Sequence, residues 1–442
     1  MQTREIKIIV FSFLALIMVG TVLLLTPMAH TGSLSVIDAV FTATSAVCVT
    51  GLIVKNTPVD FTPFGHVVIL TLIQIGGIGY MTAATFLAVM RKKRLSYRDR
   101  LVLKESLNYP GMQGVIRFLK VSLWTIVLIE LIGMVVLTIR FWFDMPFGQA
   151  LWFGIFHSVS AFNNAGFSLF EDNMMRYRGD FVINMMIPLL IIVGGLGYLV
   201  LLELYNYNKD RLVRLSTHTK VVLSTTLLLI LSGMAIILSL EWFNPKSLGS
   251  MPIDEKFLVA WFASVNFRTA GFNSIDLSTL TDSNLFFSTI FMMIGGSPGG
   301  TAGGIKTTAF AMALIGVWYT LRGETNPHIF RRSISPFIIN KSYAMIFVAS
   351  FYVIVSTVMI SEVEHMPFLK ILFEVCSAFG TVGVSVGNGG VLSYSALFSD
   401  ASKVNIIILM LMGRVGVFAF TVIFIRKAVQ SRIKYAEGKV VL

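Results

Sequence analysis

The sequence predicts an all-α polytopic membrane protein, built from four tandem copies of one helical unit around a central axis. Of its 442 residues, 55% are hydrophobic and only 13% are charged, and the mean hydropathy is +0.79. A soluble domain of this size could not bury so much apolar surface. Two further observations define the unit: long and short apolar segments alternate along the chain, and a glycine turn recurs with them.

Long apolar segments indicate about eight membrane spans, each close to the ~20 residues that a helix needs to cross the hydrocarbon. The first span follows MQTREIKIIV and is interpreted as a retained helix. Cleavage as a signal peptide is the alternative, although MVGTVLLLTPMAHTGS offers only a weak cleavage site. The predicted spans are 8–28, 64–89, 115–140, 183–205, 221–241, 284–321, 342–361 and 404–425.

Between the paired spans lie shorter semi-apolar stretches, which are too short to cross a bilayer. We interpret them as re-entrant helices or as loops outside the membrane, and each ends in a turn of small residues. The turns repeat as ATSAVCVTGL, SVSAFNNAGF, ASVNFRTAGF and VCSAFGTVGV, which align on Gly51, Gly166, Gly271 and Gly383. The stretches cover 36–47, 148–162, 256–267 and 367–379.

A second glycine pattern follows each turn, as QIGGIGYM, IVGGLGYL, MIGGSPGG and LMGRVGVF. The chain therefore divides into repeats of helix, re-entrant helix, glycine turn and helix, with boundaries at 1–107, 108–214, 215–335 and 336–442. The repeats are parallel, so we expect them to surround an axis normal to the membrane. A pseudo-fourfold central pore would lie on that axis.

The net charge of +12 could indicate a nucleic-acid partner, but the distribution of charge argues against one. Most of the 35 lysines and arginines fall at the two termini and in a few loops, where acidic residues are scarce. The positive-inside rule then places both termini and those loops in the cytoplasm. The opposite face is acidic, which would concentrate cations at an external mouth.

The glycine turns predict a binding site for cations. Non-helical backbone at membrane depth is tolerated only where it lines a cavity or is buried in protein. Turns around one axis would point their carbonyl oxygens at one place, and such a ring can replace the hydration shell of a monovalent cation. Glycine suits these turns because it adopts positive φ without a Cβ clash. The alternative is that the glycines only permit close helix packing, but their recurrence in register favours the carbonyl ring.

These turns and their flanking helices resemble the Ktr/Trk/HKT superfamily of potassium transporters, and within it the bacterial KtrB-type membrane subunits. The resemblance covers essentially the whole chain and implies a selectivity filter for K⁺ as the transported ion, with sodium dependence left open. Gly51 matches the potassium-permeable pattern, since family members with serine there tend toward sodium. The resemblance assigns the filter carbonyls to Val49, Thr50, Gly51, Asn164, Ala165, Gly166, Thr269, Ala270, Gly271, Thr381, Val382 and Gly383.

Basic residues also lie close to the predicted pathway. Arg268 stands shortly before the third filter glycine, and we expect it to point behind the filter and pair with a carboxylate such as Glu374 or Asp38. Arg414 lies deep in its span and is expected to face the pore below the filter, where the resemblance implies an electrostatic barrier. Lys306 also lies within an apolar span. For both of these spans, a side chain that snorkels to the interface is the alternative.

The stretch IGGSPGGTAGGIKTTAF interrupts the third long inner span. It suggests a phosphate-binding loop, but Ile305 stands where that motif requires glycine, and no soluble strand precedes it. We interpret it as a broken helix, because Pro298 removes a backbone donor and each glycine lowers helix stability by ~1 kcal/mol. The resemblance implies an intramembrane gate loop here, and a passive kink is the alternative. The predicted gate comprises Gly295, Gly296, Ser297, Pro298, Gly299, Gly300, Thr301, Ala302, Gly303, Gly304, Lys306 and Arg414.

The sequence leaves two other classes of protein as alternatives. A secondary transporter of another cation or a small solute could also use discontinuous helices, but such proteins usually show inverted repeats and midplane ionisable residues. Here the repeats are parallel and the intramembrane carboxylates are few. A membrane enzyme is disfavoured because the six histidines are scattered and no cluster of catalytic residue types exists in the sequence.

The resemblance also implies partners. Family members are homodimers with one pore in each subunit, and they bind a cytosolic ring of Rossmann-like, KtrA-like subunits that hold ATP or ADP. The basic segments Arg91–Lys104 and Arg322–Arg332 are predicted to dock that ring or to contact anionic lipid heads. The tail KYAEGKVVL is expected at the dimer interface. The chain itself is predicted to carry no cofactor and to lie in the bacterial cytoplasmic membrane.

Overall fold

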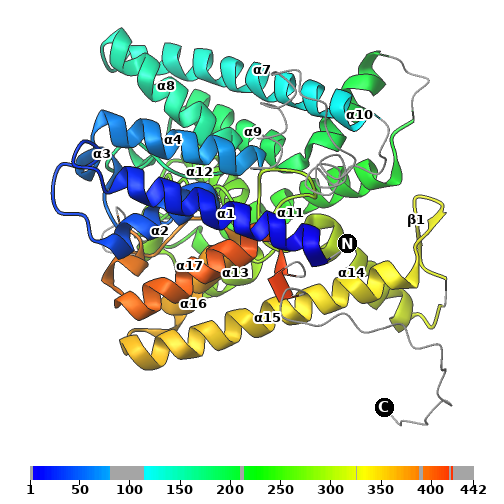
Figure 1. Cartoon of the computed structure of the whole chain (residues 1–442). Coiled ribbons are helices and arrows are strands. Elements are labelled where there is room, and N and C mark those ends of the chain that lie inside the picture. The colour runs from blue at the N-terminus through cyan, green and yellow to red at the C-terminus, as the bar shows by residue number, and fades with distance from the viewer. Residues whose placement is uncertain are drawn as a thin grey trace.

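The computed structural model describes residues 3–79, 114–209, 214–324, 326–387, 392–417 and 420–421. Within these ranges the fold is helical, as the sequence predicts, apart from one short hairpin of β1 (His328–Ile329) and β2 (Arg332–Ser333). The N-terminal end of α1 and this hairpin lie at the same end of the molecule (Figure 1).

The first helix of each repeat is long and apolar. These outer helices are α1 (Thr3–Leu24), α7 (Val115–Trp142), α11 (Thr217–Glu241) and α15 (Pro336–Glu364). Among the described helices, these four are long and apolar enough to cross a membrane, and a bent pair of helices could make a fifth span. Helices α7 and α15 run along opposite edges of the molecule (Figure 1).

The short helices lie within a few residues of the predicted re-entrant stretches. They are α2 (Val36–Val47), α8 (Phe147–Phe162), α12 (Ile253–Asn266) and α16 (Phe368–Gly380). The last three begin directly after Pro146, Pro252 and Pro367, whose fixed φ favours the start of a helix. We call these four the pore helices. The prediction of re-entrant helices, rather than loops, is confirmed for these segments.

The inner helices differ from the prediction, because more than one of them is broken. They are α4 (Pro63–Ile78), α9 (Phe181–Leu196) with α10 (Tyr198–Lys209), α13 (Asp282–Met292) with α14 (Thr307–Leu321), and α17 (Asp400–Val415). The break between α13 and α14 was predicted and is confirmed. The prediction of one continuous span over 183–205 is wrong, since α9 and α10 meet at an angle of 100°.

The unpredicted bend has a local cause in the second glycine pattern. Gly197 adopts φ of 94°, which a right-handed helix cannot accommodate. Gly79 and Gly416, at the same position of their own patterns, adopt φ of 88° and 97°. Helices α4 and α17 end directly before these glycines, so the pattern stops or turns the inner helix in three of the four repeats.

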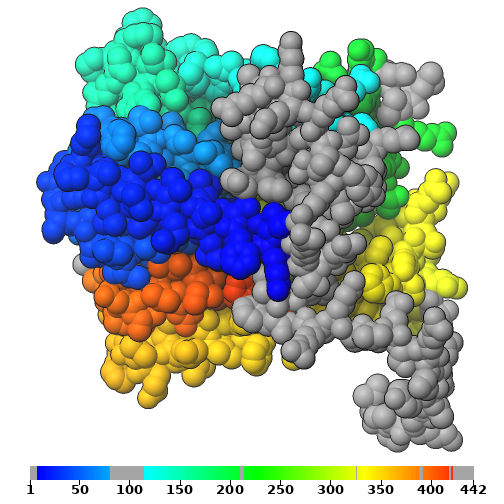
Figure 2. Space-filling view, viewed as in Figure 1, coloured from blue at the N-terminus to red at the C-terminus, as the bar shows by residue number. Residues whose placement is uncertain are grey.

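The repeats form a closed ring. Each inner helix packs on the pore helix of the following repeat: α4 on α8, α9 on α12, α13 on α16, and α17 back on α2. The last of these contacts joins the two ends of the chain, and Figure 2 shows the first-repeat surface in blue against the fourth-repeat surface in orange. An ion pair of 2.8 Å between Lys403 and Asp38 crosses this seam. The pseudo-fourfold arrangement of the prediction is thereby confirmed.

Short elements follow the filter turns and lie on one side of the ring. They are α3 (Thr57–Asp60), η1 (Met175–Tyr177), η2 (Leu277–Thr279) and η4 (Tyr394–Leu397). Large phenylalanines fill the space behind the pore helices, among them the fully buried Phe41, Phe156, Phe262 and Phe373, one from each pore helix. This packing holds the turns rigidly around the axis.

Candidate functional site

The four glycine turns share one backbone conformation. In each turn the glycine has positive φ, with values of 96°, 69°, 78° and 89° along the chain. The residue two places earlier also has positive φ, although none of these is glycine, and the residue between them does not. These left-handed residues are Val49, Asn164, Thr269 and Thr381. A strained conformation repeated four times is typical of a functional site that the surrounding structure holds in place.

Carbonyl oxygens of the turns converge on the axis. A Cβ added to Gly51 would lie 2.5 Å from the Ala165 carbonyl oxygen, and one added to Gly166 would lie 2.7 Å from that of Ala270. A Cβ on Gly271 would lie 3.0 Å from the Val382 oxygen. A Cβ added to Gly383 would clash with the Thr50 carbonyl oxygen of the first turn. The turns from all four repeats therefore face one another through main-chain oxygen and glycine Cα.

The pore helices add electrostatic and geometric support. Each ends directly before its turn, and the C-terminal end of a helix carries a partial negative charge that favours a nearby cation. Side chains of the same helices hold the turns: Ser45 accepts from the Gly51 amide at 3.0 Å, and Ser377 accepts from that of Gly383 at 3.0 Å. In repeat two the serine at the same position, Ser160, instead donates to the Phe167 carbonyl oxygen at 2.8 Å. In repeat three Asn266 Oδ1 accepts from the Phe272 amide at 2.8 Å.

A cavity opens on the side of the ring where the post-filter elements lie. All four filter glycines line it, together with neutral polar groups from the segments that follow the turns. The four predicted filter glycines are thus brought together in the lining of one cavity. The role of these residues in selecting ions stays a prediction.

Buried carboxylates brace the site from behind. Glu374 of α16 accepts hydrogen bonds from the hydroxyls of Ser385 and Ser395 and from the Ser395 amide at 2.9 Å. Glu241 at the end of α11 binds the Thr281 amide at 2.9 Å and the Asn284 amide group at 3.1 Å. Each carboxylate connects its own helix to a segment on the other side of the turn.

We expect Glu374→Ala to lower the thermal midpoint of the purified protein in detergent. The substitution would leave the Ser385 and Ser395 donors buried without an acceptor, which costs about 3 kcal/mol. Glu362→Ala is the matched control, because Glu362 is exposed on α15. Equal midpoints for the two variants would show that the Glu374 carboxylate does not brace the fold.

The glycine-rich loop between α13 and α14 lies on the opposite side of the turns from the cavity. Its amides bind the inner helices of neighbouring repeats, with Ser297 N to Gly195 O at 2.9 Å and Gly304 N to Gly413 O at 3.2 Å. It begins and ends at a parallel bridge between Ile294 and Ile305. The loop is therefore a compact plug held by the inner helices α9 and α17.

Filter side chains also bind this loop, which the sequence did not reveal. The Thr301 hydroxyl donates to Asn164 Oδ1 at 2.9 Å, and the Gly303 amide donates to the Thr381 hydroxyl at 3.1 Å. Asn164 and Thr381 are the left-handed residues of turns two and four. Their side chains thus point away from the cavity and connect the filter to the loop.

Arg414 contacts the loop as predicted. Its guanidinium donates to the carbonyl oxygen of Thr301 in the loop and to those of Gly76 and Gly77 in α4, the last at 2.9 Å. The Lys306 ammonium donates to the Ala302 carbonyl oxygen at 2.6 Å. Two cations therefore lie against the loop, and both bind main-chain oxygen instead of a carboxylate.

The predicted ion pair of Arg268 is wrong. Asp38 pairs with Lys403, and Glu374 is occupied by serine donors. Arg268 is buried, and it has no carboxylate partner in the described part of the chain. Its Nε atom has no hydrogen-bond partner there either. Ring closure gives Asp38 to Lys403, and the segment after the fourth turn gives Glu374 its serine donors.

A second unpredicted cluster lies between repeats one and two. Gln74 of α4 donates to Glu130 Oε2 at 3.1 Å, and Asn163 Nδ2 donates to Gln74 Oε1 at 2.8 Å and to Glu130 Oε1 at 3.1 Å. Asn163 directly precedes a filter residue. The only signal in the sequence was a glutamate inside an apolar span, which indicates a buried polar partner without naming it.

A closed ring of re-entrant helices, with converging carbonyl oxygens at one end and a glycine loop beneath, defines a class of protein. It is the class of multi-pass membrane transporters with a channel-like pathway. Comparison with known proteins then identifies the family. Residues 2–434 match the model of the TrkH cation transport proteins, and the chain belongs to that family.

Individual relatives cover nearly the same length. The chain is 40% identical over 434 residues to Ktr system potassium uptake protein B of Bacillus subtilis, covering 98% of this chain and 96% of the relative. It is 36% identical to potassium/sodium uptake protein NtpJ of Enterococcus hirae, covering 100% of this chain and 98% of the relative. The crystal structure of the potassium transporter TrkH from Vibrio parahaemolyticus superposes with a TM-score of 0.74 at 18% identity. That match covers 96% of this chain and 85% of the other and supports the fold.

Proposed function

We propose that this chain takes up K⁺ across the bacterial cytoplasmic membrane through a channel-like pore whose filter is the four glycine turns. The convergence of carbonyl oxygens from aligned turns carries the proposal, because such oxygens can replace the water around K⁺. The names of the relatives, which specify potassium uptake, support this ion. The Enterococcus relative is named for sodium as well, so uptake could also depend on Na⁺.

In this mechanism the cation loses water at the turns and is held there by main-chain oxygen and by the negative ends of the pore helices. It then meets the glycine loop, which we propose is the gate. Arg414 contributes a positive charge beside the loop, and its bonds to Thr301 and to α4 stabilise the closed position. Passage requires the loop to move, which is a two-state change of the kind that a partner can bias.

Regulation and assembly are also proposed. The charge distribution supports cytoplasmic termini, and the β1–β2 hairpin presents the exposed Arg331 and Arg332 at the N-terminal end of the molecule. We propose that this face docks a cytosolic nucleotide-binding ring and that the chain forms homodimers. The other predicted docking segment, Arg91–Lys104, and the C-terminal tail lie outside the described residues.

Expression in a bacterial strain without its own potassium uptake systems tests the function. We expect the chain to restore growth at low external K⁺ and to raise rubidium uptake well above that of the empty vector. K⁺ should compete with rubidium more strongly than Na⁺ does. A chain that reaches the membrane but gives no rubidium uptake, alone or with a ring subunit, would contradict the proposal.

A secondary transporter of another cation or a small solute is the second candidate. The bent helices α9–α10 and the broken pair α13–α14 favour it, since discontinuous helices are also used by such transporters. Purified protein in vesicles separates the two. A coupled transporter would require a second ion gradient for net rubidium flux, whereas a channel-like pore would need only a rubidium gradient and a counter-ion path.

A further inference from the structure

The cavity outside the turns contains one ionisable side chain among the described residues that line it, Glu171. The rest of the lining consists of main chain, apolar groups and neutral polar side chains, including the amides of Asn56, Asn173 and Asn273. Glu171 is exposed and lies on the loop that directly follows the second turn. A single carboxylate therefore borders the place where an ion would leave bulk water for the filter.

Neighbouring carboxylates of repeats two and three are paired with arginines, and Glu171 is not. Asp172, the next residue, accepts from Arg176 at 2.7 Å, and Glu255 lies 3.4 Å from Arg178. Glu171 forms no ion pair or hydrogen bond with any residue in the part of the chain that the structure describes. It therefore lines the cavity as an exposed carboxylate without a counter-ion among the described residues.

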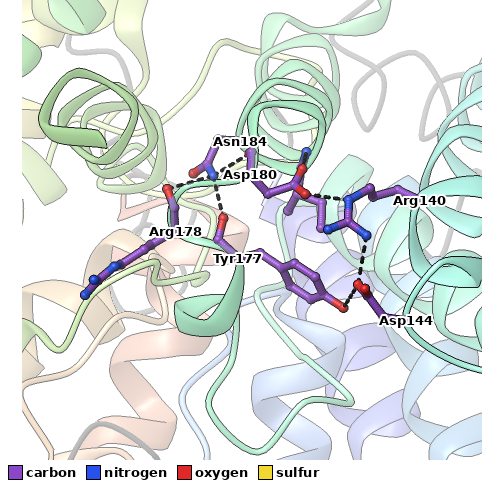
Figure 3. Close-up of polar contacts among 7 residues, drawn as sticks. Arg140, Asp144, Tyr177, Arg178, Asp180 and Asn184 are labelled. Atoms are coloured by element: carbon purple, nitrogen blue, oxygen red, sulfur yellow. Dashed lines mark hydrogen bonds and ion pairs between the residues drawn. The ribbon is translucent and has the colours of Figure 1, made fainter. Parts of the chain in front are cut away.

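The loop that carries Glu171 is fixed at its far end by a polar network (Figure 3). Arg140 of α7 lies between Asp144 and Asp180, and Asp180 caps α9. The Tyr177 hydroxyl donates to Asp144 at 3.1 Å, and burial together with the Asp144 charge raises the pKa of Tyr177 to about 12. Tyr177 therefore remains a donor at any physiological pH. The Asn184 amide group donates to main-chain oxygens of the loop, including that of Tyr177 at 2.7 Å.

A second anchor joins the loop to repeat three at the edge of the cavity. The Met174 amide donates to the Asn273 carbonyl oxygen at 3.1 Å, and the Asn273 amide donates to Asn173 Oδ1 at 3.4 Å. The main chain on the C-terminal side of Glu171 is thereby held against the third turn. The carboxylate keeps its place beside the filter instead of moving freely on a long loop.

We propose that Glu171 captures hydrated monovalent cations at the outer mouth and so sets the apparent affinity for external K⁺. The inference rests on the proposed uptake function and adds a residue to it. An exposed charge acts only over about 8 Å at physiological ionic strength, so more distant acidic residues are screened. A carboxylate that lines the same cavity as the filter glycines raises the local cation concentration and the rate of entry, without altering the ring of carbonyl oxygens.

The test measures rubidium uptake against external concentration in the potassium-uptake-deficient strain, for Glu171→Gln, Glu171→Asp and Asp172→Asn. Uptake is recorded at low ionic strength and again after addition of N-methylglucamine chloride, with surface amounts measured for each variant. We expect Glu171→Gln to raise KM by about threefold to tenfold at unchanged maximal rate. Glu171→Asp should keep the wild-type KM, and added salt should shrink the difference.

Asp172→Asn is the matched control, because it changes the net charge equally at a residue that does not line the cavity. It should leave KM close to that of the wild type. The proposal is overturned if Glu171→Gln leaves KM unchanged, if it lowers only the maximal rate, or if Asp172→Asn has the same effect. Absence of uptake by the wild-type chain would instead contradict the proposed function, so the two failures are distinguishable.

Discussion

Gly51→Ser is expected to reduce the preference for K⁺ over Na⁺ by about tenfold or more, because it distorts the ring of carbonyl oxygens that would replace water around the ion. A Cβ at this position would lie 2.5 Å from the Ala165 carbonyl oxygen, so that oxygen must leave its place. The residue also has φ of 96°, which serine adopts only with strain. The measurement is competition of K⁺ and Na⁺ against rubidium uptake.

Gly148→Ser serves as the control for this substitution. Gly148 lies near the start of pore helix α8, and a Cβ there meets no atom within 4 Å. Its uptake and ion preference should match those of the wild type. If Gly51→Ser keeps the potassium preference while the protein reaches the membrane, the assignment of the filter is wrong.

Deletion of Ser297–Gly303 is expected to raise the rubidium flux per surface molecule by about tenfold, equivalent to about 1.4 kcal/mol of lost stabilisation of the closed arrangement. The deleted residues include the amides that bind α9 and the group that binds the Thr381 hydroxyl. Removing them takes the plug from beneath the filter. Unchanged flux in a protein that still inserts would show that the loop is not the gate.

Arg414→Gln tests the same gate with a single side chain. It removes one positive charge and the guanidinium bonds to Thr301, Gly76 and Gly77, so flux should rise in the same direction as for the deletion. Arg322→Gln is the control, because Arg322 stacks on Trp318 away from the turns. Combining Arg414→Gln with the deletion should add little, since both changes act on one closed state.

The re-entrant helices and the turns could be predicted because they repeat. A short apolar stretch alone is ambiguous, but four aligned copies restrict the interpretation to one architecture, and the observed α2 and α16 lie within a residue or two of the predicted segments. The predicted filter residues were likewise brought together. Repeated units are expected to be related by symmetry, and that symmetry brings residues that are far apart in the chain to one axis.

The bend at Gly197 could not be predicted in the same way. Its segment is apolar on both sides of the glycine, and a single glycine in a helical pattern is usually tolerated at a cost of ~1 kcal/mol. The positive φ of Gly197 permits the turn, and the neighbouring repeat holds it: the Tyr198 amide, which begins α10, donates to the Gly299 carbonyl oxygen of the loop. A contact of this kind depends on the assembled ring and leaves no local pattern.

The pairing of polar side chains from different repeats also could not be predicted from the sequence. Lys403 and Asp38 are separated by almost the whole chain, and Glu130 accepts a hydrogen bond from Gln74 of another repeat. Charge complementarity shows which residues could pair, but it does not show which of them lie close enough in the folded chain to do so. The misassigned partner of Arg268 shows this limit, since Asp38 pairs across the ring with Lys403 and Glu374 binds serines of its own repeat.

The contact of α17 with α2 has a consequence for biosynthesis. The first turn is synthesised early, yet its neighbours on one side, Gly383 and the Lys403 that pairs with Asp38, are among the last parts of the chain to leave the ribosome. A chain that stops before the fourth repeat cannot form a partial pathway, because the fourth repeat supplies one side of the ring that encloses it. Completion of the ion path is therefore a late event in translation, and a premature stop codon in the last repeat should be as damaging as one in the first.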